Sequence, residues 1–267
     1  MICDTHCHLN LEDHFSDLDL IINKARDKGI TRILVPGINY STSQKAVQLC
    51  DKYPEIFAAV GIHPNEANAW NKTSYHQLRA LAIHPKVVAI GEIGLDLYRK
   101  YTPLPIQTYA LEQQLMLATE TNKPVILHNR DATKELFHII EAWIEKNKAT
   151  NQRPDPYIGV FHSYFGDLKT AQRIIDLGFL IGISGPITFK NDHGMREIVS
   201  TLFGKSMIAE TDSPYQSPVP HRGEPNEPSN IIFIYEMLST ILKENLETTV
   251  KRISQYSNQL FRWDQVT

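Results

Sequence analysis

The sequence has 267 residues, of which 42% are hydrophobic and 21% are charged, proportions that are ordinary for a globular protein with a large core. A chain of this length fits one large domain or two small ones, and single (β/α)8 barrels commonly have about 250 residues. The formal net charge of −3 argues against binding of nucleic acid or anionic membranes through an overall basic surface, but not against an enzyme that binds phosphates through metal ions.

Short segments rich in β-branched and aliphatic residues recur along the chain and predict strands. In chain order they are Ile2–His8, Arg32–Pro36, Phe57–His63, Val87–Leu95, Val125–His128, Tyr157–His162, Phe179–Ser184 and Met207–Asp212. Most are almost continuously apolar, as expected for strands that are buried on both faces of a parallel sheet.

Segments with helical periodicity lie between these strands. The apolar faces that predict helices are Leu18, Ile21, Ile22 and Ala25; Leu136, Ile140, Trp143 and Ile144; Ile198, Val199 and Leu202; Ile231, Ile234, Leu238 and Ile241; and Val250, Ile253 and Leu260. Ser16 is expected to cap the first of these helices, with Asp19 three residues later. Pro228 suits the first turn of the helix that follows the last strand.

The alternation of strands and helices predicts a closed (β/α)8 barrel, a TIM barrel, in which residues 1–267 form a single domain. An open doubly wound sheet is the alternative. Three proline-containing stretches are interpreted as loops and not as interdomain linkers: Thr102–Pro105, Arg153–Pro156 and Pro214–Pro228.

The cysteines and the N-terminus indicate the compartment. Cys3, Cys7 and Cys50 lack the paired spacing of a disulfide framework, which favours free thiols in a reducing environment. No basic stretch followed by an apolar run begins the chain, so we expect no signal peptide. No apolar stretch reaches the about 18 residues that cross a bilayer. We expect a cytoplasmic protein without a membrane partner, and no obligate protein partner is evident.

Polar residues stand at the C-terminal ends of the predicted strands, which form the reactive face of a (β/α)8 barrel. The first strand ends in His6-Cys7-His8, and since side chains alternate along a strand, His6 and His8 should point the same way and chelate a metal. The candidate ligands at the ends of later strands are Glu92, His128, His162 and Asp212. This many polar groups on one buried rim would be costly without a metal, so the sequence predicts a metal site.

Each candidate ligand also has a structural interpretation. A single histidine at a strand end is more often a hydrogen-bonded structural residue, and a carboxylate there often caps the next helix. His63 would lie beside the ligands. The histidines interpreted as solvent-exposed are His14, His76, His84, His138 and His193, and the role of His221 stays open.

Six motifs follow one another along essentially the full chain: Asp4–Leu9, Val60–Pro64, Gly91–Asp96, Pro124–Arg130, Glu210–Tyr215, and Arg222-Gly223 with Asn226–Pro228. Together they resemble the TatD family of metal-dependent deoxyribonucleases, within the amidohydrolase-like barrels. The resemblance implies that one divalent ion is bound by His6, His8 and Asp212. It also implies that His128 and His162 bind a second ion and that Glu92 bridges the two.

The sequence departs from this family at two places. Ser163-Tyr164-Phe165-Gly166 follows His162, where the family usually has Cys-Phe-Ser/Thr-Gly, and Leu111 stands where the family tends to carry Phe. Neither departure removes a ligand. The first lies next to the site, so it puts the substrate specificity in question more than the chemistry. Glu92 stands where many amidohydrolase relatives carry a carboxylated lysine, which argues against cyclic-amide hydrolases as the nearest kin.

Two divalent ions about 3.5–4 Å apart can share a hydroxide and hold the attacking and leaving oxygens of a phosphodiester. Histidine and carboxylate ligands permit Mg, Mn or Zn. Asp212 is the candidate general base as well as a ligand, and Glu92 would take part in catalysis as the bridge. His63 would contact the scissile phosphate or the leaving group, or else orient Glu92.

Further residues are candidates for substrate contacts. Arg130 would bind a phosphate, with a salt bridge to Asp131 as the alternative. The tyrosines that would either stack on unpaired bases or pack at the barrel rim are Tyr98, Tyr164 and Tyr215. Asp96 and Glu210 are candidates for orienting the ligands, and Asp96 could equally cap a loop.

The first functional hypothesis, implied by the resemblance, is a deoxyribonuclease of the 3′-5′ exonuclease type that acts on single-stranded or end-bound DNA. The second is a metal-dependent hydrolase of another ester or amide, for example an aminoacyl-tRNA deacylase. The third is a non-catalytic barrel that serves as a binding module, against which the intact set of ligands speaks.

Overall fold

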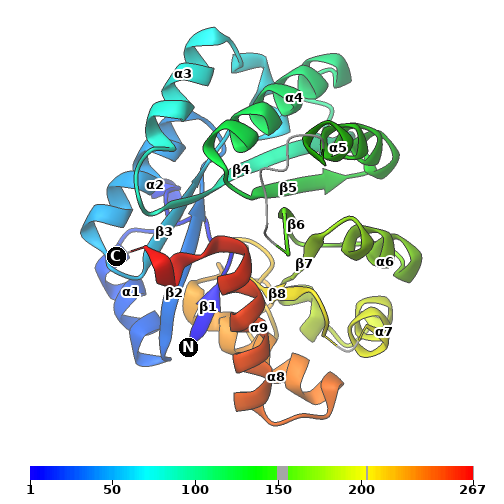
Figure 1. The fold of residues 1–267 in the computed structure, drawn as a ribbon. Coiled ribbons are helices and arrows are strands. Elements are labelled where there is room, and N and C mark those ends of the chain that lie inside the picture. Colours follow the sequence, from blue (N-terminus) through cyan, green and yellow to red (C-terminus); the bar gives the residue numbers. More distant parts are fainter. Residues whose placement is uncertain (149–155, 203, 267) are drawn as a thin grey trace.

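The structure is a computed structural model that describes residues 1–148, 156–202 and 204–266 (Figure 1). Its eight strands form one parallel sheet in which each strand pairs with the next along the chain. The strands are β1 Ile2–Asp4, β2 Ile30–Pro36, β3 Ile56–Val60, β4 Val87–Asp96, β5 Val125–Arg130, β6 Gly159–Phe161, β7 Phe179–Ile183 and β8 Met207–Ala209. The predicted (β/α)8 barrel is confirmed.

Helices alternate with these strands and surround the sheet. They are α1 Leu18–Asp27, α2 Tyr40–Lys52, α3 Lys72–Leu81, α4 Leu104–Thr121, α5 Thr133–Lys148, α6 Leu168–Asp176, α7 His193–Thr201, α8 Ile231–Leu242 and α9 Leu246–Phe261. In the part of the chain that the structure describes, none of them has the length and apolarity needed to cross a membrane.

Hydrogen bonds between the segments that follow β1 and β8 close the barrel. The backbone N–H of Thr5 donates to the carbonyl of Ala209 at 3.2 Å, and that of Asp212 donates to the carbonyl of His6 at 2.8 Å. The buried carboxylate of Asp4 adds to this closure, since it accepts hydrogen bonds from the backbone and hydroxyl of Thr211 at 2.9 and 2.6 Å. The open sheet is therefore excluded.

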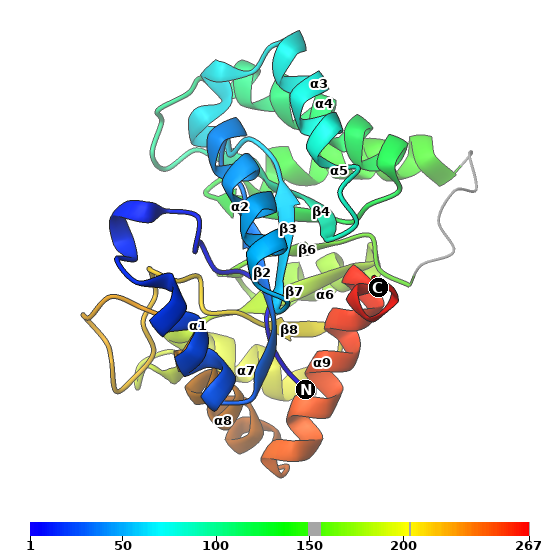
Figure 2. The same cartoon turned by 90° about the vertical axis from the view of Figure 1, so that its left-hand side faces the viewer.

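One end of the barrel is closed by the C-terminal segment. Trp263 is fully buried there, with ring centres 5.6 Å from Phe57 and 5.2 Å from Phe261. Figure 2 shows α9 and the C-terminus on the side of the barrel where the chain begins. The opposite end, where the strands finish, is the end that carries the polar residues.

Several predicted strands are too long at their C-terminal ends. The first was expected to reach His8 but ends at Asp4, and the last was expected to reach Asp212 but ends at Ala209. Asp212 has a φ of 55°, which ends the extended conformation. Beyond β1 the chain stays locally extended, because Cys7 forms one isolated bridge with Ser213. The predicted strands that end at His63, His162 and Ser184 likewise extend beyond the observed strands.

Some local predictions also need correction. Asp17, not Ser16, caps α1, because the carboxylate of Asp17 accepts the N–H of Leu20 at 2.9 Å. The predicted loop Thr102–Pro105 is partly helical, since α4 begins at Leu104. Of the predicted loop Arg153–Pro156, residues 153–155 lie outside the described residues. Pro228 begins a short 3-10 turn, Pro228–Asn230, that leads into α8 as expected.

Candidate metal centre

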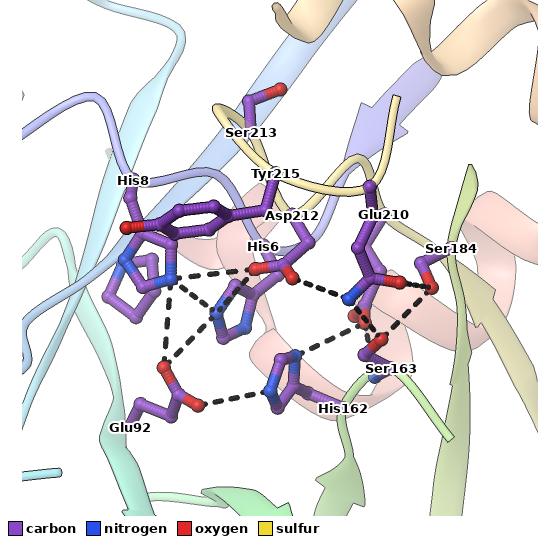
Figure 3. Close-up of polar contacts among 12 residues, drawn as sticks. His6, His8, Glu92, His162, Ser163, Ser184, Glu210, Asp212, Ser213 and Tyr215 are labelled. Atoms are coloured by element: carbon purple, nitrogen blue, oxygen red, sulfur yellow. Dashed lines mark hydrogen bonds and ion pairs between the residues drawn. The ribbon is translucent and has the colours of Figure 1, made fainter. Parts of the chain in front are cut away.

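Histidine and carboxylate side chains converge at the C-terminal ends of the strands (Figure 3). His6 and His8 do point the same way, and their Nε2 atoms are 3.2 Å apart. Three overlapping groups of side chains could hold a metal ion: His6, His8 and Asp212; His6, Glu92 and His162; and His63, Glu92 and His128. The structure therefore brings together the six residues predicted as ligands, with His63 beside them.

Four donors, from His6, His8, Asp212 and Glu92, form a first cage around one point. The Nε2 of His6 lies 3.4 Å from Oε2 of Glu92 and 3.8 Å from Oδ1 of Asp212. The Nε2 of His8 lies 3.7 and 3.5 Å from the same two oxygens. These separations are longer than hydrogen bonds. The centre of a regular tetrahedron with such edges lies about 2.2 Å from each corner, which matches metal–ligand distances for nitrogen and oxygen donors. The cage thus fits a divalent ion.

Glu92 faces two sets of donors at once, the first cage and a second group formed by His128 and His162. Its Oε2 belongs to the first cage, whereas its Oε1 lies 2.8 Å from Nδ1 of His128 and 3.0 Å from Nε2 of His162. The side chain comes from the middle of β4 and is almost completely buried. A carboxylate whose two oxygens face separate sets of imidazoles has the geometry of a bridging ligand.

His128 is held from behind by a carboxylate. It turns Nδ1 toward Glu92, and its Nε2 lies 3.3 Å from Oδ2 of Asp96. Asp96 is itself fixed by the backbone N–H groups of Tyr98 and Arg99, at 3.0 and 2.8 Å. Such a carboxylate sets the ring orientation and makes the ligand nitrogen more basic.

His162 has the same kind of support. Its Nδ1 lies 3.4 Å from Oε1 of Glu210, a carboxylate that is fully buried. The same oxygen accepts the backbone N–H of Ser163. Asp96 and Glu210, both expected near the ligands, thus lie behind the two histidines of the second group.

The ionisation states of His6 and Glu92 suit metal binding, whereas the pKa of His162 is raised, so an ion must displace the proton of that ring. Burial, with a contribution from His162, lowers the pKa of His6, so this imidazole is neutral near pH 7. Burial alone would raise the pKa of Glu92, but His162 and His63 hold it well below its usual value. Neutral imidazoles and ionised carboxylates are the forms that bind divalent ions.

His63 is a hydrogen-bond donor at the edge of the site. Its Nδ1 accepts the backbone N–H of Asn65 at 3.1 Å, so the proton of the neutral ring is on Nε2, which lies 3.5 Å from Oε1 of Glu92. Burial and the neighbouring His128 lower the pKa of His63 to about 3, which keeps the ring neutral. A protonated Nε2 cannot bind a metal, so this geometry favours a donor role over a ligand role.

Arg130 and the predicted tyrosines occupy different environments. The guanidinium carbon of Arg130 lies 3.9 Å from the centre of the Tyr98 ring, so within the described chain this residue stacks on an aromatic ring and does not pair with Asp131. Tyr98 and Tyr215 are exposed to 55% and 49%. Tyr164 is buried and donates its hydroxyl to the carbonyl of Asp167, so it packs and cannot stack on a substrate.

The histidines expected at the surface are mostly exposed. His84 is half-buried and lies 3.2 Å from Asp51, while His14, His76, His138 and His193 are exposed. His14 nevertheless belongs to the mouth of the barrel, since its ring centre lies 6.0 Å from that of Tyr215. The Nδ1 of His221 lies 2.9 Å from Oε2 of Glu224.

One contact to a predicted ligand was missed from the sequence. The amide nitrogen of Gln216 donates to Oδ2 of Asp212 at 2.6 Å, and it also contacts the hydroxyl of Ser163 at 2.6 Å. The only sequence signal was a polar residue four positions after Asp212. Nothing in its spacing indicates that the chain turns back there.

A parallel eight-stranded barrel with buried histidines and carboxylates at its C-terminal rim defines a metal-dependent hydrolase. The profile of the family described as TatD related DNase matches residues 3–262, and the chain belongs to this family.

Comparison with individual proteins agrees. The chain is 32% identical to the metal-dependent hydrolase YabD of Bacillus subtilis over 262 residues, which cover 98% of this chain and 99% of that protein. It is 31% identical to the 3′-5′ ssDNA/RNA exonuclease TatD of Pantoea ananatis over 264 residues, which cover 97% and 98% of the two chains. The crystal structure of the TatD homologue YjjV from Escherichia coli has a TM-score of 0.88 and 28% identity, with 98% of each chain covered.

Proposed function

We propose that the protein is a nuclease that hydrolyses phosphodiester bonds of DNA from a 3′ end, with two divalent ions at the barrel mouth. The observation that carries this proposal is the position of Glu92, whose two oxygens face two separate groups of histidines. His6, His8 and Asp212 would hold one ion, His128 and His162 the other, and Glu92 both.

Bound there, Mg, Mn or Zn would activate a water as the nucleophile and neutralise the charge of a phosphate. Asp212 would accept the proton of the attacking water. Burial would raise the pKa of its carboxyl, but His8 and His162 keep it below its usual value, so the carboxylate is ionised and able to accept a proton. His63, through its Nε2–H, would donate a hydrogen bond to a phosphate oxygen or to the leaving group.

The rim of the barrel supports a substrate with unpaired bases. Tyr98, Phe165 and Tyr215 are exposed on the segments that follow β4, β6 and β8, and aromatic rings of this kind stack on bases regardless of sequence. Arg130, whose guanidinium carbon lies 3.9 Å from the centre of the Tyr98 ring, would offer its N–H groups to a phosphate. The slightly negative chain suits a short strand end held at the mouth better than a long duplex. Two Pantoea relatives are named 3′-5′ ssDNA/RNA exonucleases, which agrees with a single-stranded substrate.

The thiols bear on the compartment. The free cysteines Cys3, Cys7 and Cys50 are all buried, and burial raises the pKa of Cys3 and of Cys50 to about 12. Unpaired, unreactive thiols support a cytoplasmic location.

The test is a nuclease assay with purified protein reloaded with Mg, Mn or Zn. We expect linear single-stranded DNA to be shortened and circular single-stranded DNA to resist. Asp212→Asn should abolish the activity, while Asp51→Asn, at an exposed aspartate beside His84, should leave it unchanged. Protein that contains metal by elemental analysis but cleaves no DNA with any of the three ions would contradict the proposal. Release of an amino acid from aminoacyl-tRNA would then favour the ester-hydrolase alternative.

The bridge is tested separately by metal content. Glu92→Gln replaces one carboxylate oxygen with an amide nitrogen that cannot bind a metal, so one of the two groups must lose a ligand. We expect the variant to bind fewer ions per chain than the parent protein or than Glu112→Gln, at an exposed position on α4. Unchanged stoichiometry would show that Glu92 is not a bridge.

A further inference from the structure

The two carboxylate oxygens of Asp212 have different neighbours (Figure 3). Oδ1 faces the Nε2 atoms of His6 and His8, 3.8 and 3.5 Å away. Oδ2 accepts a hydrogen bond from the amide nitrogen of Gln216 at 2.6 Å. One oxygen therefore faces the candidate ion position, and the other is occupied by a neutral donor from the same loop.

The amide of Gln216 is held in place by two serines. The hydroxyl of Ser184 donates to its Oε1 at 2.9 Å, and its Nε2 donates to the hydroxyl oxygen of Ser163 at 2.6 Å. The two serine oxygens are 3.0 Å apart. Since a serine has one hydroxyl proton and Ser184 gives its proton to Gln216, Ser163 must donate to Ser184. Gln216, Ser163 and Ser184 thus form a closed ring of hydrogen bonds with a single direction.

This ring leaves one N–H of Gln216 free of the serines, and that N–H points at Asp212. Turning the amide over would set Oε1 against the carboxylate and leave two acceptors facing each other at 2.6 Å. The serines alone would accept either orientation of the amide, because each hydroxyl can donate or accept. The carboxylate of Asp212 therefore fixes the direction of the ring, and the ring holds the amide against the carboxylate.

The backbone holds the ring in place. Ser163, Asp212 and Gln216 have φ angles of 42°, 55° and 53°, a left-handed conformation that is uncommon for residues other than glycine. Gly185 lies so close that a Cβ added there would be 1.8 Å from the carbonyl oxygen of Gln216. Ser184 is buried at the end of β7. The segments after β6, β7 and β8 are thus fastened to one another beside Asp212.

The same ring reaches the second group of donors. The backbone N–H of Ser163 donates to Glu210, whose carboxylate lies behind His162. The side chain of Ser163 therefore contacts Gln216, which holds Asp212. Its backbone contacts Glu210, which lies behind His162.

We propose that Gln216 is a positioning residue, which with Ser163 and Ser184 holds Asp212 as a one-oxygen ligand. The amide occupies Oδ2, so that Oδ1 alone is presented to the ion. The proposal rests on the assignment of Asp212 as a ligand in the proposed function. It does not depend on which substrate the enzyme cleaves.

The experiment is a titration of metal-free protein with Mn²⁺ or Co²⁺, followed by calorimetry and, for Co²⁺, by the visible absorption spectrum. Gln216→Met keeps the length of the side chain and removes its hydrogen bonds. We expect one of the two ions to bind about 10–100-fold more weakly, the usual effect of losing a residue that supports a ligand. We also expect the Co²⁺ bands to change, because a carboxylate freed at Oδ2 can rotate and bind through both oxygens. Ser163→Ala, which leaves the bond to Asp212 but opens the ring, should cause a smaller loss of affinity.

The matched control is Gln172→Met. Gln172 also donates from its amide to an aspartate, Asp176, at 2.8 Å, but on the exposed surface of α6. The Gln172→Met variant should bind both ions as tightly as the parent protein does. Thermal unfolding without metal checks that each variant folds, and if Gln216→Met does not, Ser163→Ala and Ser184→Ala carry the test.

The outcomes separate the two proposals. If Asp212→Asn weakens binding while Gln216→Met, Ser163→Ala and Ser184→Ala match the control in affinity and spectrum, the positioning role is refuted and the ligand assignment stands. If Asp212→Asn itself binds both ions normally, the ligand assignment fails and the positioning role fails with it. If Asp212→Asn and Gln216→Met both bind the ions more weakly, and the Co²⁺ spectrum of Gln216→Met is altered, the ligand assignment and the positioning role are both supported. This holds even if no DNA is cleaved.

Discussion

The substitution Gly182→Ala tests whether Glu210 orients His162. Gly182 lies in β7, and a Cβ at this position would stand 2.5 Å from Oε2 of Glu210 and 2.8 Å from its Cδ and Oε1. Ordinary contact begins at 3.4 Å, so the carboxylate would have to withdraw by about 0.9 Å, the difference between 3.4 and 2.5 Å. Gly182 has no positive φ angle, so the backbone itself accepts alanine.

The displaced carboxylate has nowhere favourable to go. Glu210 is fully buried, accepts the N–H of Ser163, and lies 3.4 Å from Nδ1 of His162. Overpacking of this kind destabilises a protein by about 1–3 kcal/mol. Loss of the carboxylate behind a ligand should weaken metal binding by about 10–100-fold, although the substitution changes no ligand.

The assay is competition for Zn²⁺ or Mn²⁺ between the protein and a chelator of known affinity. Gly194→Ala is the matched control, because a Cβ at Gly194, in α7, would meet no atom within 4 Å. If Gly182→Ala folds and binds both ions as tightly as Gly194→Ala does, Glu210 does not orient His162 and the reasoning is wrong.

Three further predictions concern the substrate, the proton and the fold. Arg130→Ala should raise KM for a short single-stranded DNA about 10-fold with little change in kcat. Arg130→Lys should restore only part of the lost affinity, since an ammonium cannot pair with two phosphate oxygens. An unchanged KM for Arg130→Ala would rule out the phosphate contact. Although burial opposes it, Glu92 keeps the pKa of His162 well above the usual histidine value of 6.5. The stabilising charge of His162 is therefore complete below about pH 6.5 and is lost as the pH rises through the folded-state pKa. A bound ion must displace that proton, so the rise in unfolding temperature that saturating Mn²⁺ produces should be larger near pH 8 than near pH 6; equal rises would contradict this. Trp263→Ala should cost about 3–5 kcal/mol of unfolding free energy by chemical denaturation yet leave metal affinity unchanged, because Trp263 seals the opposite end of the barrel.

The fold could be predicted because the strands of this barrel are buried on both faces. Val87–Leu95 was expected to be a strand and β4 runs from Val87 to Asp96, since an apolar run bounded by polar residues marks such a strand at both ends. The ends of β1 and β8 could not be placed in the same way. Their last hydrogen bonds depend on contacts between residues that are 204 positions apart, such as Thr5 and Ala209.

The positions of the candidate ligands followed from topology, because the C-terminal ends of neighbouring parallel strands meet on one rim. The neighbours of the individual ligand atoms could not be predicted in this way. His128 turns Nδ1 and not Nε2 toward Glu92 because Asp96, the last residue of β4, meets the other nitrogen. Which nitrogen of His128 faces Glu92 depends on the register of β4 against β5, in which Asp96 lies beside Arg130. The spacing of residues in the sequence does not determine this register.

Ser163 shows how a departure from the family pattern changes meaning once contacts are known. From the sequence, the replacement next to His162 suggested an altered substrate pocket. In the structure its hydroxyl does not face open space but takes part in the ring with Ser184 and Gln216 that ends on Asp212. A cysteine thiol is a weak donor and a weak acceptor, so it would support that ring poorly. The departure is therefore better explained by how this chain holds a candidate metal ligand than by which substrate it accepts, and the affinity of Ser163→Cys for Mn²⁺, compared with that of Ser163→Ala, would decide between these two explanations.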